Sequence, residues 1–259
     1  MVLNKLEPKI SVVIHTYNAA RELPKALDAV RDFDEVLVCD MESTDNTVEI
    51  AEKYGCRIIT FPKGNHTCCE PARTFAIQSA AYDWVLTVDA DEIVTPQLHD
   101  FLYDAIKKDD CPAGFWIPRK NFFMGRYMHS DYPDYQLRFF KKEGTEWPPF
   151  AHTSPSVQGE TVKIPRRRKE LALIHLADTR MEVRMRKMNG YTESEMVKRA
   201  GRKYNFGSLL WRPLLRFIKS YIVKGGFLDG KAGFINARMD AFYQFVLISK
   251  ILEKKYESE

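Results

Sequence analysis

Three acidic residues stand within four positions in the stretch WVLTVDADEIVTP, residues 84–96. Asp89, Asp91 and Glu92 follow an apolar, β-branched run that predicts a buried strand. Like charges at the end of such a strand repel one another and resist desolvation. A hard divalent cation, Mg²⁺ or Mn²⁺, would offset this repulsion, because it binds one or two carboxylates and fills its other positions with water and substrate phosphates. The alternative is a solvated turn whose acids favour the N-terminus of the next helix.

Strand-like and helix-like runs alternate through the first hundred residues and would position these acids. The alternation predicts an α/β fold with a mostly parallel sheet covered by helices on both faces. Ligands of such sheets bind beyond the carboxyl ends of the strands. The polar segments HTYN, CDMESTDNT and DADE all follow predicted strands, so we expect them to meet in one crevice. The predicted strands span residues 10–15, 35–39, 57–61 and 84–88.

Beyond a helix predicted at PQLHDFLYDAIKK, the pattern changes to short strand-like pieces and then to basic helices. The strand-like pieces are GFWIP, QLRFFK, TVKIP and LALIHL, and the helical part begins near residue 180. Residues 163–224 contain 17 Lys or Arg against 5 Asp or Glu, which predicts attraction to polyanions. No apolar stretch suggests a membrane span or a secretory leader, and the five cysteines show no disulfide spacing, which fits a reducing compartment.

Three motifs, in this order and at these spacings, resemble family 2 glycosyltransferases of the GT-A fold: SVVIHTYN, VLVCDMESTDNT and WVLTVDADE. YPDYQLRFF, His152 and GGFLDGKAGF further resemble the branch of bacterial lipopolysaccharide-core β-glucosyltransferases. The resemblance implies a GT-A catalytic domain at 1–178, with nucleotide-sugar binding in 8–110 and an acceptor and catalytic part in 111–178. A basic amphipathic helical region, expected to associate with a membrane, would follow at 179–259.

The resemblance also implies a nucleotide-diphosphate sugar as donor, and we expect a UDP-sugar. Asp40 would accept a hydrogen bond from the base, and Arg73 would lie near the base or the diphosphate. Ser43, Thr44 and Asp45 are expected to cap the following helix rather than to touch the donor. The nucleoside pocket would be lined by Thr16, Tyr17 and Asn18.

Metal binding would fall mainly to the acidic cluster. By the same resemblance, Asp91 would ligate Mn²⁺ or Mg²⁺ directly, and Asp89 would approach the ribose and the metal. His152 is a candidate metal ligand or acceptor contact, with a structural role as the alternative. His175 ranks below His152 as a contact of the metal or diphosphate. Thr74 stands where the family often has Asn, which puts that donor contact in doubt.

Transfer of the sugar would need a carboxylate that takes the proton of the acceptor hydroxyl as it attacks C1. The segment HSDYPDYQLRFF offers Asp134 as the expected base and Asp131 as the second candidate, and turn formation around Pro133 is the alternative role. Arg138 would steady the diphosphate or pair with a neighbouring acid. One displacement of this kind inverts the anomeric carbon.

The stretch FGSLLWRPLLRFIKSYIVKGGF interleaves bulky apolar residues with Arg212, Arg216, Lys219 and Lys224. Such a pattern predicts a helix in the interface of an anionic membrane. The alternative is an apolar stripe packed on the catalytic domain. We therefore expect a cytoplasmic protein held peripherally at the inner face of the cytoplasmic membrane.

Together these features predict a metal-dependent, inverting hexosyltransferase acting on a cell-envelope glycan, with a lipid-linked or lipopolysaccharide-core acceptor. Two alternatives stay open. A nucleotidyltransferase would share the sheet and the metal-binding acids, but no Gly-rich, basic loop follows the first strand to grip a triphosphate. A non-catalytic protein that binds polyanions or membrane surfaces would use the basic tail alone. Nucleic acid is not an expected partner, since no motif for it is present.

Overall fold

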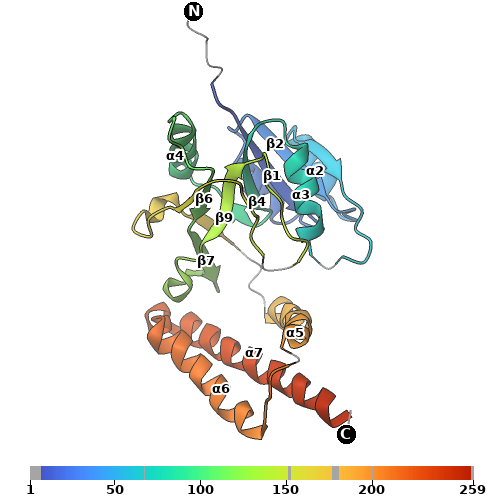
Figure 1. The fold of residues 1–259 in the computed structure, drawn as a ribbon, viewed down its shortest axis with the longest axis vertical. Coiled ribbons are helices and arrows are strands. Elements are labelled where there is room, and N and C mark those ends of the chain that lie inside the picture. Colours follow the sequence, from blue (N-terminus) through green and yellow to red (C-terminus); the bar gives the residue numbers. More distant parts are fainter. Residues whose placement is uncertain (1–6, 67, 151–152, 177–180, 200, 258–259) are drawn as a thin grey trace, which may run out of the picture. The chain divides into compact units, whose positions relative to one another are not determined.

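The protein is described by a computed structural model in which two compact units can be distinguished (Figure 1). The first, here called the sheet unit, comprises Met1–Lys120 and Pro133–His175. The second, the helical unit, comprises Asn121–Tyr132 and Leu176–Glu259. The structure describes residues 7–66, 68–150, 153–176, 181–199 and 201–257.

A seven-stranded sheet forms the centre of the sheet unit, in the order β10-β6-β9-β4-β1-β2-β3. Neighbouring strands are parallel except at β9, which runs antiparallel to both β4 and β6. The mostly parallel α/β sheet expected from the sequence is therefore confirmed. The strands are β1 (Ile10–Thr16), β2 (Glu35–Asp40), β3 (Arg57–Thr60), β4 (Trp84–Asp89), β6 (Gly114–Ile117), β9 (Gln136–Lys141) and β10 (Thr161–Lys163).

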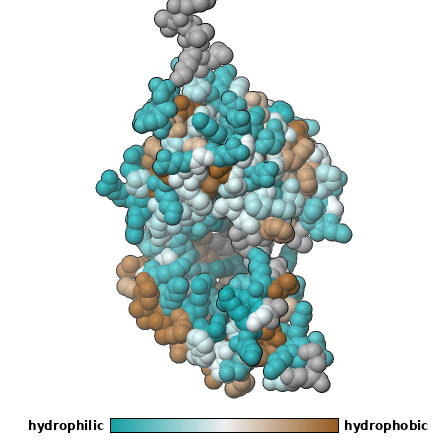
Figure 2. Space-filling view, in the orientation of Figure 1, coloured by the Kyte–Doolittle hydropathy of each residue, from teal (hydrophilic) through white to brown (hydrophobic). Residues whose placement is uncertain are grey.

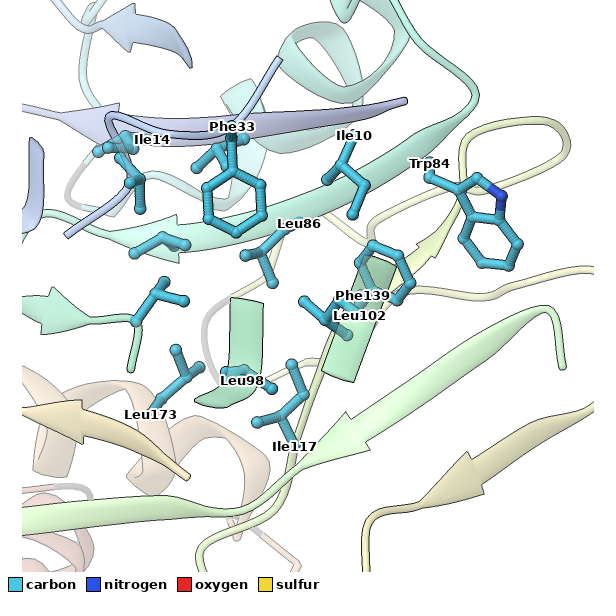
Figure 3. Packing of buried hydrophobic residues seen from close by; sticks show 14 of the residues in the cluster. Ile10, Ile14, Phe33, Trp84, Leu86, Leu98, Leu102, Ile117, Phe139 and Leu173 are labelled. Carbon is cyan, nitrogen blue, oxygen red and sulfur yellow. The ribbon is translucent and has the colours of Figure 1, made fainter. Parts of the chain in front are cut away.

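Helices cover both faces of this sheet, as its double-sided hydrophobicity requires. Successive side chains of a strand point to opposite faces, so β1 contributes Val12 and Ile14 to one core and Val13 to the other. The first core receives side chains from α1, α2 and α4 and includes Leu86 and Leu98 (Figure 3). The second receives side chains from α3. The helices are α1 (Leu23–Asp28), α2 (Thr47–Lys53), α3 (Glu70–Ser79) and α4 (Pro96–Ile106).

Short strands complete the second half of the sheet unit. All four strand-like pieces predicted between residues 113 and 176 contain a strand, the last being β11 (Leu173–His175). Three strands were not predicted: β5 (Glu92–Ile93), β7 (Arg119–Phe123) and β8 (Arg126–Tyr127). β5 follows β4 after two residues and pairs antiparallel with β11, which places His175 opposite Glu92.

Three helices dominate the helical unit: α5 (Met181–Lys198), α6 (Phe206–Ile218) and α7 (Gly230–Glu257). Asn205 caps α6 in a reciprocal box with Ser208, which satisfies two free N–H groups of the first turn. A π-helical turn (Lys219–Val223) and a 3-10 turn (Gly226–Asp229) connect α6 to α7, which lies alongside it (Figure 1). Within the described residues, no helix is both long and apolar enough to cross a membrane.

Asp229 ties the segment Asn121–Tyr132 to the helices. Its buried carboxylate accepts the backbone N–H groups of His129 (2.8 Å) and Ser130 (3.1 Å) and also bonds both side chains. Burial alone would raise the pKa of Asp229, but these hydrogen bonds hold it below the ordinary value. Residues 121–132 fall within the predicted catalytic part, whose boundaries stay a prediction, and in the structure they group with the helices, where Asp229 contacts two of them.

Two glycines of the GGFLDGKAGF segment allow α7 to begin close to the preceding turn. A Cβ on Gly233 would lie 1.9 Å from the carbonyl oxygen of Gly226. A Cβ on Gly226 would lie 2.7 Å from the carbonyl oxygen of Ser220. Both neighbours are backbone atoms, which cannot move aside as a side chain can, so the segment is a packing element of the helical unit.

Replacing Gly233 by Ala should therefore destabilise the protein by more than about 1 kcal/mol, through overpacking. Gly190 in α5 provides the matched control, because a Cβ there meets nothing within 4 Å. Gly190→Ala should stabilise the protein by about 0.5–1 kcal/mol, since Gly weakens a helix interior. Chemical denaturation of both variants measures the difference, and equal stability of the two would contradict the packing described for Gly233.

Candidate active site

The strand register brings the three polar strand ends together. Thr16 at the end of β1 lies opposite Asp40 at the end of β2. On its other side β1 pairs with β4, where His15 lies opposite Asp89. The expected convergence of these ends at one edge of the sheet is thus observed in the register.

Side-chain hydrogen bonds join the loops that follow β1 and β2. Thr16 Oγ1 donates to Asp40 Oδ1 (2.8 Å), and Asp40 Oδ2 accepts the backbone N–H of Ser43 (2.8 Å). Ser43 Oγ accepts the N–H of Asn18, whose own Oδ1 accepts the N–H of Thr44, both at 2.8 Å. Asn18 has a φ of 50°, a conformation that Asn tolerates better than most residues. Asp40 and Asn18 thus shape the two loops, and their contacts with a donor stay predictions.

Asp45 and Tyr17 complete this part of the edge. Asp45 Oδ1 accepts the N–H of Thr47, the first residue of α2, at 3.0 Å, and Asp45 Oδ2 accepts the N–H of Ala20 at 3.2 Å. Asp45 therefore binds the first N–H of the helix, but the N-cap residue is Asn46, whose side chain makes no cap bond, and Ser43 and Thr44 bond Asn18 instead of capping the helix as expected. The Tyr17 ring is exposed and carries the Lys63 ammonium 4.9 Å from its centroid. An exposed aromatic face is available for a flat ligand such as a nucleobase.

The first acid of the DADE motif is neutralised by two arginines. Asp89 Oδ1 accepts from Arg73 Nη2 at 2.9 Å, and Asp89 Oδ2 forms an ion pair with Arg138 Nη2. Burial alone would raise the pKa of Asp89, but the charges of Arg138 and Arg73 bring it well below its usual value. In the structure both carboxylate oxygens of Asp89 face guanidinium groups. Its expected approach to a metal stays a prediction. Arg138 in turn takes the role of an ion-pair partner, one of the two roles considered for it.

Glu92, the third acid, is fully buried and connects two arginines. Its Oε1 accepts from Arg119 Nη1 at 3.0 Å and from Arg138 Nη2 at 3.3 Å. Its Oε2 accepts the backbone N–H of Asp89 at 3.0 Å, which holds the turn after β4. The repulsion inherent in the DADE sequence is therefore relieved largely by arginine.

The same chain of charges reaches the expected catalytic base. Arg119 donates from Nε (2.9 Å) and Nη2 (2.6 Å) to Asp134 Oδ2, and Gln136 Nε2 donates to Asp134 Oδ1 at 3.0 Å. The Asp134 side chain remains 31% exposed, so a substrate can approach it. Asp131, the second candidate, groups with the helical unit and accepts from Asn236 Nδ2 at 3.2 Å. The alternating ion-pair chain runs Arg73, Asp89, Arg138, Glu92, Arg119, Asp134.

Asp91 differs from its neighbours, because its partner is a histidine. His175 Nε2 lies 3.4 Å from Asp91 Oδ2, and the two side chains are 20% and 26% exposed. The pairing of β5 with β11 creates this proximity. Among the described residues no three His, Cys, Asp or Glu side chains gather as a metal site. The Asp91 carboxylate nevertheless suits Mn²⁺ or Mg²⁺ whose other positions are filled by water and phosphate oxygens. His152 lies outside the described residues.

Trp147 packs against Arg73, and Thr74 holds Trp147 in place. The Arg73 guanidinium lies 4.4 Å from the centroid of the Trp147 ring, a favourable cation–π distance. Thr74 Oγ1 accepts the backbone N–H of Trp147 at 2.8 Å and donates to the backbone carbonyl oxygen of Trp147 at 3.2 Å. Thr74, where the family often has Asn, thus anchors this ring. Trp147 and Arg119 could not be recognised from the sequence, because each lies far along the chain from the residues it contacts, whereas Glu92 was considered only as a member of the acidic cluster.

His15 lies next to this charged cluster and was also missed. It is buried, and neither ring nitrogen has a hydrogen-bond partner among the described residues. Burial, together with the positive charges of Arg73 and Arg138, lowers the pKa of His15 well below its ordinary value, against the opposing effect of Asp89. His15 is therefore a buried, uncharged imidazole close to two arginines.

Comparison with known proteins identifies the family. Residues 11–158 match the family model described as glycosyl transferase family 2. The match spans more than half of the chain. The chain therefore belongs to family 2 of the glycosyltransferases, and the resemblance seen in its motifs is confirmed.

Relatives match along nearly the whole chain. An uncharacterized glycosyltransferase of Rickettsia conorii is 28% identical over 279 residues, which cover 99% of this chain and 95% of the relative. The lipopolysaccharide core biosynthesis glycosyltransferase LpsC of Rhizobium meliloti is 22% identical over 256 residues, covering 95% and 92%.

Solved structures share the fold. The mannosyltransferase PcManGT of Pyrobaculum calidifontis, in complex with GDP-Man and Mn²⁺, aligns over 97% of this chain and 89% of its own, with a TM-score of 0.56 and 15% identity. TarS 1–349 of S. aureus aligns over 92% and 81%, with a TM-score of 0.50 and 16% identity. These similarities confirm the GT-A-like α/β fold.

The ion pairs predict unequal effects of two neighbouring acids on stability. Asp89→Asn should lower the free energy of unfolding by about 3 kcal/mol or more, because it leaves buried guanidinium charge uncompensated. Asp91→Asn should cost less than about 1 kcal/mol, because Asp91 pairs with a partly exposed histidine and not with a buried guanidinium. Urea denaturation at neutral pH compares the two variants, and equal losses would refute the assignment.

His15 predicts a pH dependence of stability. The unfolded chain protonates this residue near pH 6.5, whereas the native state resists protonation. The contribution of His15 to the free energy of unfolding is therefore fully present above about pH 6.5. Below that pH it decreases by up to about 1.4 kcal/mol per pH unit. His15→Gln should lose less stability than the wild type between about pH 7 and about pH 5.5. Parallel losses in denaturation curves would exclude His15 as the source.

Proposed function

We propose that this family 2 glycosyltransferase moves a hexose from a nucleotide-diphosphate sugar to a hydroxyl of a cell-envelope glycan, with inversion at C1. The observation that carries the proposal is the Asp91–His175 pair, which stands beside an Asp89 whose oxygens are held by arginines. The pair places one carboxylate and one imidazole at the edge of the sheet where ligands bind.

A UDP-sugar is the donor we propose, with Mn²⁺ or Mg²⁺. Asp91 and His175 would hold the cation, which offsets the negative charge that develops on the leaving diphosphate. PcManGT was solved with GDP-Man and Mn²⁺, which supports a nucleotide sugar and a divalent metal in a chain of this fold. The exposed Tyr17 ring would receive the nucleobase, next to the loops that Asp40 holds.

Asp134 is the base we propose for the acceptor hydroxyl. Arg119 and Gln136 fix the direction of its carboxylate by three hydrogen bonds. The hydroxyl oxygen attacks C1 on the face opposite the diphosphate, and its proton passes to Asp134 as the bond to the leaving oxygen breaks. Arg119 also bonds Glu92, the residue next to Asp91, so the base and the donor site share one rigid support.

The acceptor we propose is a lipid-linked or lipopolysaccharide-core glycan at the inner face of the cytoplasmic membrane. The similarity to LpsC, named for lipopolysaccharide core biosynthesis, supports this choice. The enzyme would then act as a peripheral protein at that face.

Donor binding tests the metal site. Asp91→Ala and His175→Ala should each abolish the Mn²⁺-dependent rise in melting temperature that a matching nucleotide sugar produces, because a ligand of the native state raises it. Asp104→Ala, an exposed acid of α4, is the matched control and should behave as the wild type. The panel should include UDP- and GDP-sugars. Retention of the Mn²⁺-dependent shift in both site variants would reject the proposed metal site.

Single-turnover transfer tests the base. Asp134→Asn should leave donor binding intact and lower the rate of transfer at least about a hundredfold, as the loss of a general base does. Asp131→Asn, with its carboxylate in the helical unit, should keep most of the wild-type rate. If Asp134→Asn transfers sugar at the wild-type rate, the base is another group.

A further inference from the structure

We infer that the helical unit carries a docking surface for an anionic lipid bilayer, formed by the outer face of α6 and the π-helical turn that continues it. We call it the α6 face. In Figure 2 apolar side chains gather over this part of the helical unit. The α6 face presents Phe206, Leu210, Leu214, Ile218, Ile222 and Val223, all exposed.

The spacing of these side chains places them on one side of a helix. Phe206, Leu210, Leu214 and Ile218 follow one another at intervals of four, as neighbours on a helix face do. Phe206 is 74% exposed and Leu210 is 66% exposed. Amphipathic helices of globular proteins normally bury such a stripe against a core. Here the apolar stripe faces outward, so it requires an apolar partner.

The opposite side of the same helix is engaged with α7. Arg216 pairs with Asp240 of α7 at 3.4 Å, and Ser220 of the π-helical turn bonds the same carboxylate. The Arg212 guanidinium lies over the rings of Tyr204 and Trp211. Two of the four cations that the sequence suggested for lipid binding are thus held within the helical unit.

The positive charge of this segment favours an anionic partner. The sequence has no Asp or Glu between Glu195 and Asp229, whereas eight Lys or Arg lie in that interval. Lys219 and Lys224 are exposed at the end of the α6 face. Each basic residue near an anionic bilayer strengthens binding about fivefold, and apolar side chains beside it enter the interface.

A second copy of the chain fits this surface less well than a bilayer. A two-fold contact through the α6 face would bring like-charged segments together without an acid to offset them. Trp211, which is 47% exposed, adds an amphipathic ring of the kind enriched at membrane interfaces. Anionic phospholipid therefore matches both the charge and the apolar character.

This inference depends on the proposed function only for the reason why the enzyme would bind a bilayer, which is access to a lipid-linked acceptor. Flotation of the full chain with vesicles tests it without any sugar nucleotide, so its failure and a failure of donor binding are separate results. Vesicles of phosphatidylcholine alone are compared with an equal mixture of phosphatidylcholine and phosphatidylglycerol.

The wild type should float with the mixed vesicles and not with phosphatidylcholine alone. Leu214→Glu should reduce the partition coefficient more than about tenfold. Val197→Glu, the same change at an exposed apolar residue of α5, should not. Lys219→Gln with Lys224→Gln should reduce it about thirtyfold, whereas the exposed pair Lys107→Gln with Lys108→Gln should have no effect.

Three results would overturn the inference. The first is no flotation of the wild type, and the second is equal flotation with both kinds of vesicle. The third is a dimer in size-exclusion chromatography that Leu214→Glu dissociates, which would assign the α6 face to self-association. The lysine variants keep the test decisive if Leu214→Glu fails to fold, because exposed lysines contribute little to stability.

Discussion

Two buried guanidinium groups at the carboxyl edge of the sheet must be neutralised, and the rest of the site is arranged around that requirement. Arg73 and Arg138 are almost fully removed from solvent, and Asp89 supplies the counter-charge that both share. Removing one partner from such a set is costly, since an uncompensated charge stays buried. Glu92 and Arg119 extend the alternation to Asp134, so no member can move without disturbing the next.

This requirement divides the acids of the DADE motif into two classes. Asp89 and Glu92 pair with arginines, whereas Asp91, whose side chain is as exposed as that of Asp89, lies beside His175. A site in which charges are fixed before substrate arrives needs little reorganisation during reaction, which is how preorganised electrostatics lower a barrier. The same division explains how three acids tolerate one short turn, because each has its own positively charged or hydrogen-donating partner.

The strands of the seven-stranded sheet, their order of appearance and the convergence of their polar ends could be predicted, since alternation of strands and helices determines where carboxyl ends meet. The arginine network could not be predicted. Glu92 and Arg119 are 27 residues apart and meet only through tertiary packing. The nearness of His175 to Asp91 depends on β5, a strand of two residues that periodicity cannot detect. The segment Asn121–Tyr132 contacts the helices through residues far along the chain, among them the buried carboxylate of Asp229 and Ala232 of α7.

We propose that Asp91 and His175 hold the metal, whereas both oxygens of Asp89 are engaged by arginine. Pulsed electron paramagnetic resonance of Mn²⁺ bound with nucleoside diphosphate tests this assignment most directly, since it detects an imidazole nitrogen coordinated to the ion. We expect a nitrogen coupling in the wild type and in Asp89→Asn that disappears in His175→Gln. A coupling that persists in His175→Gln, or none in the wild type, would contradict it.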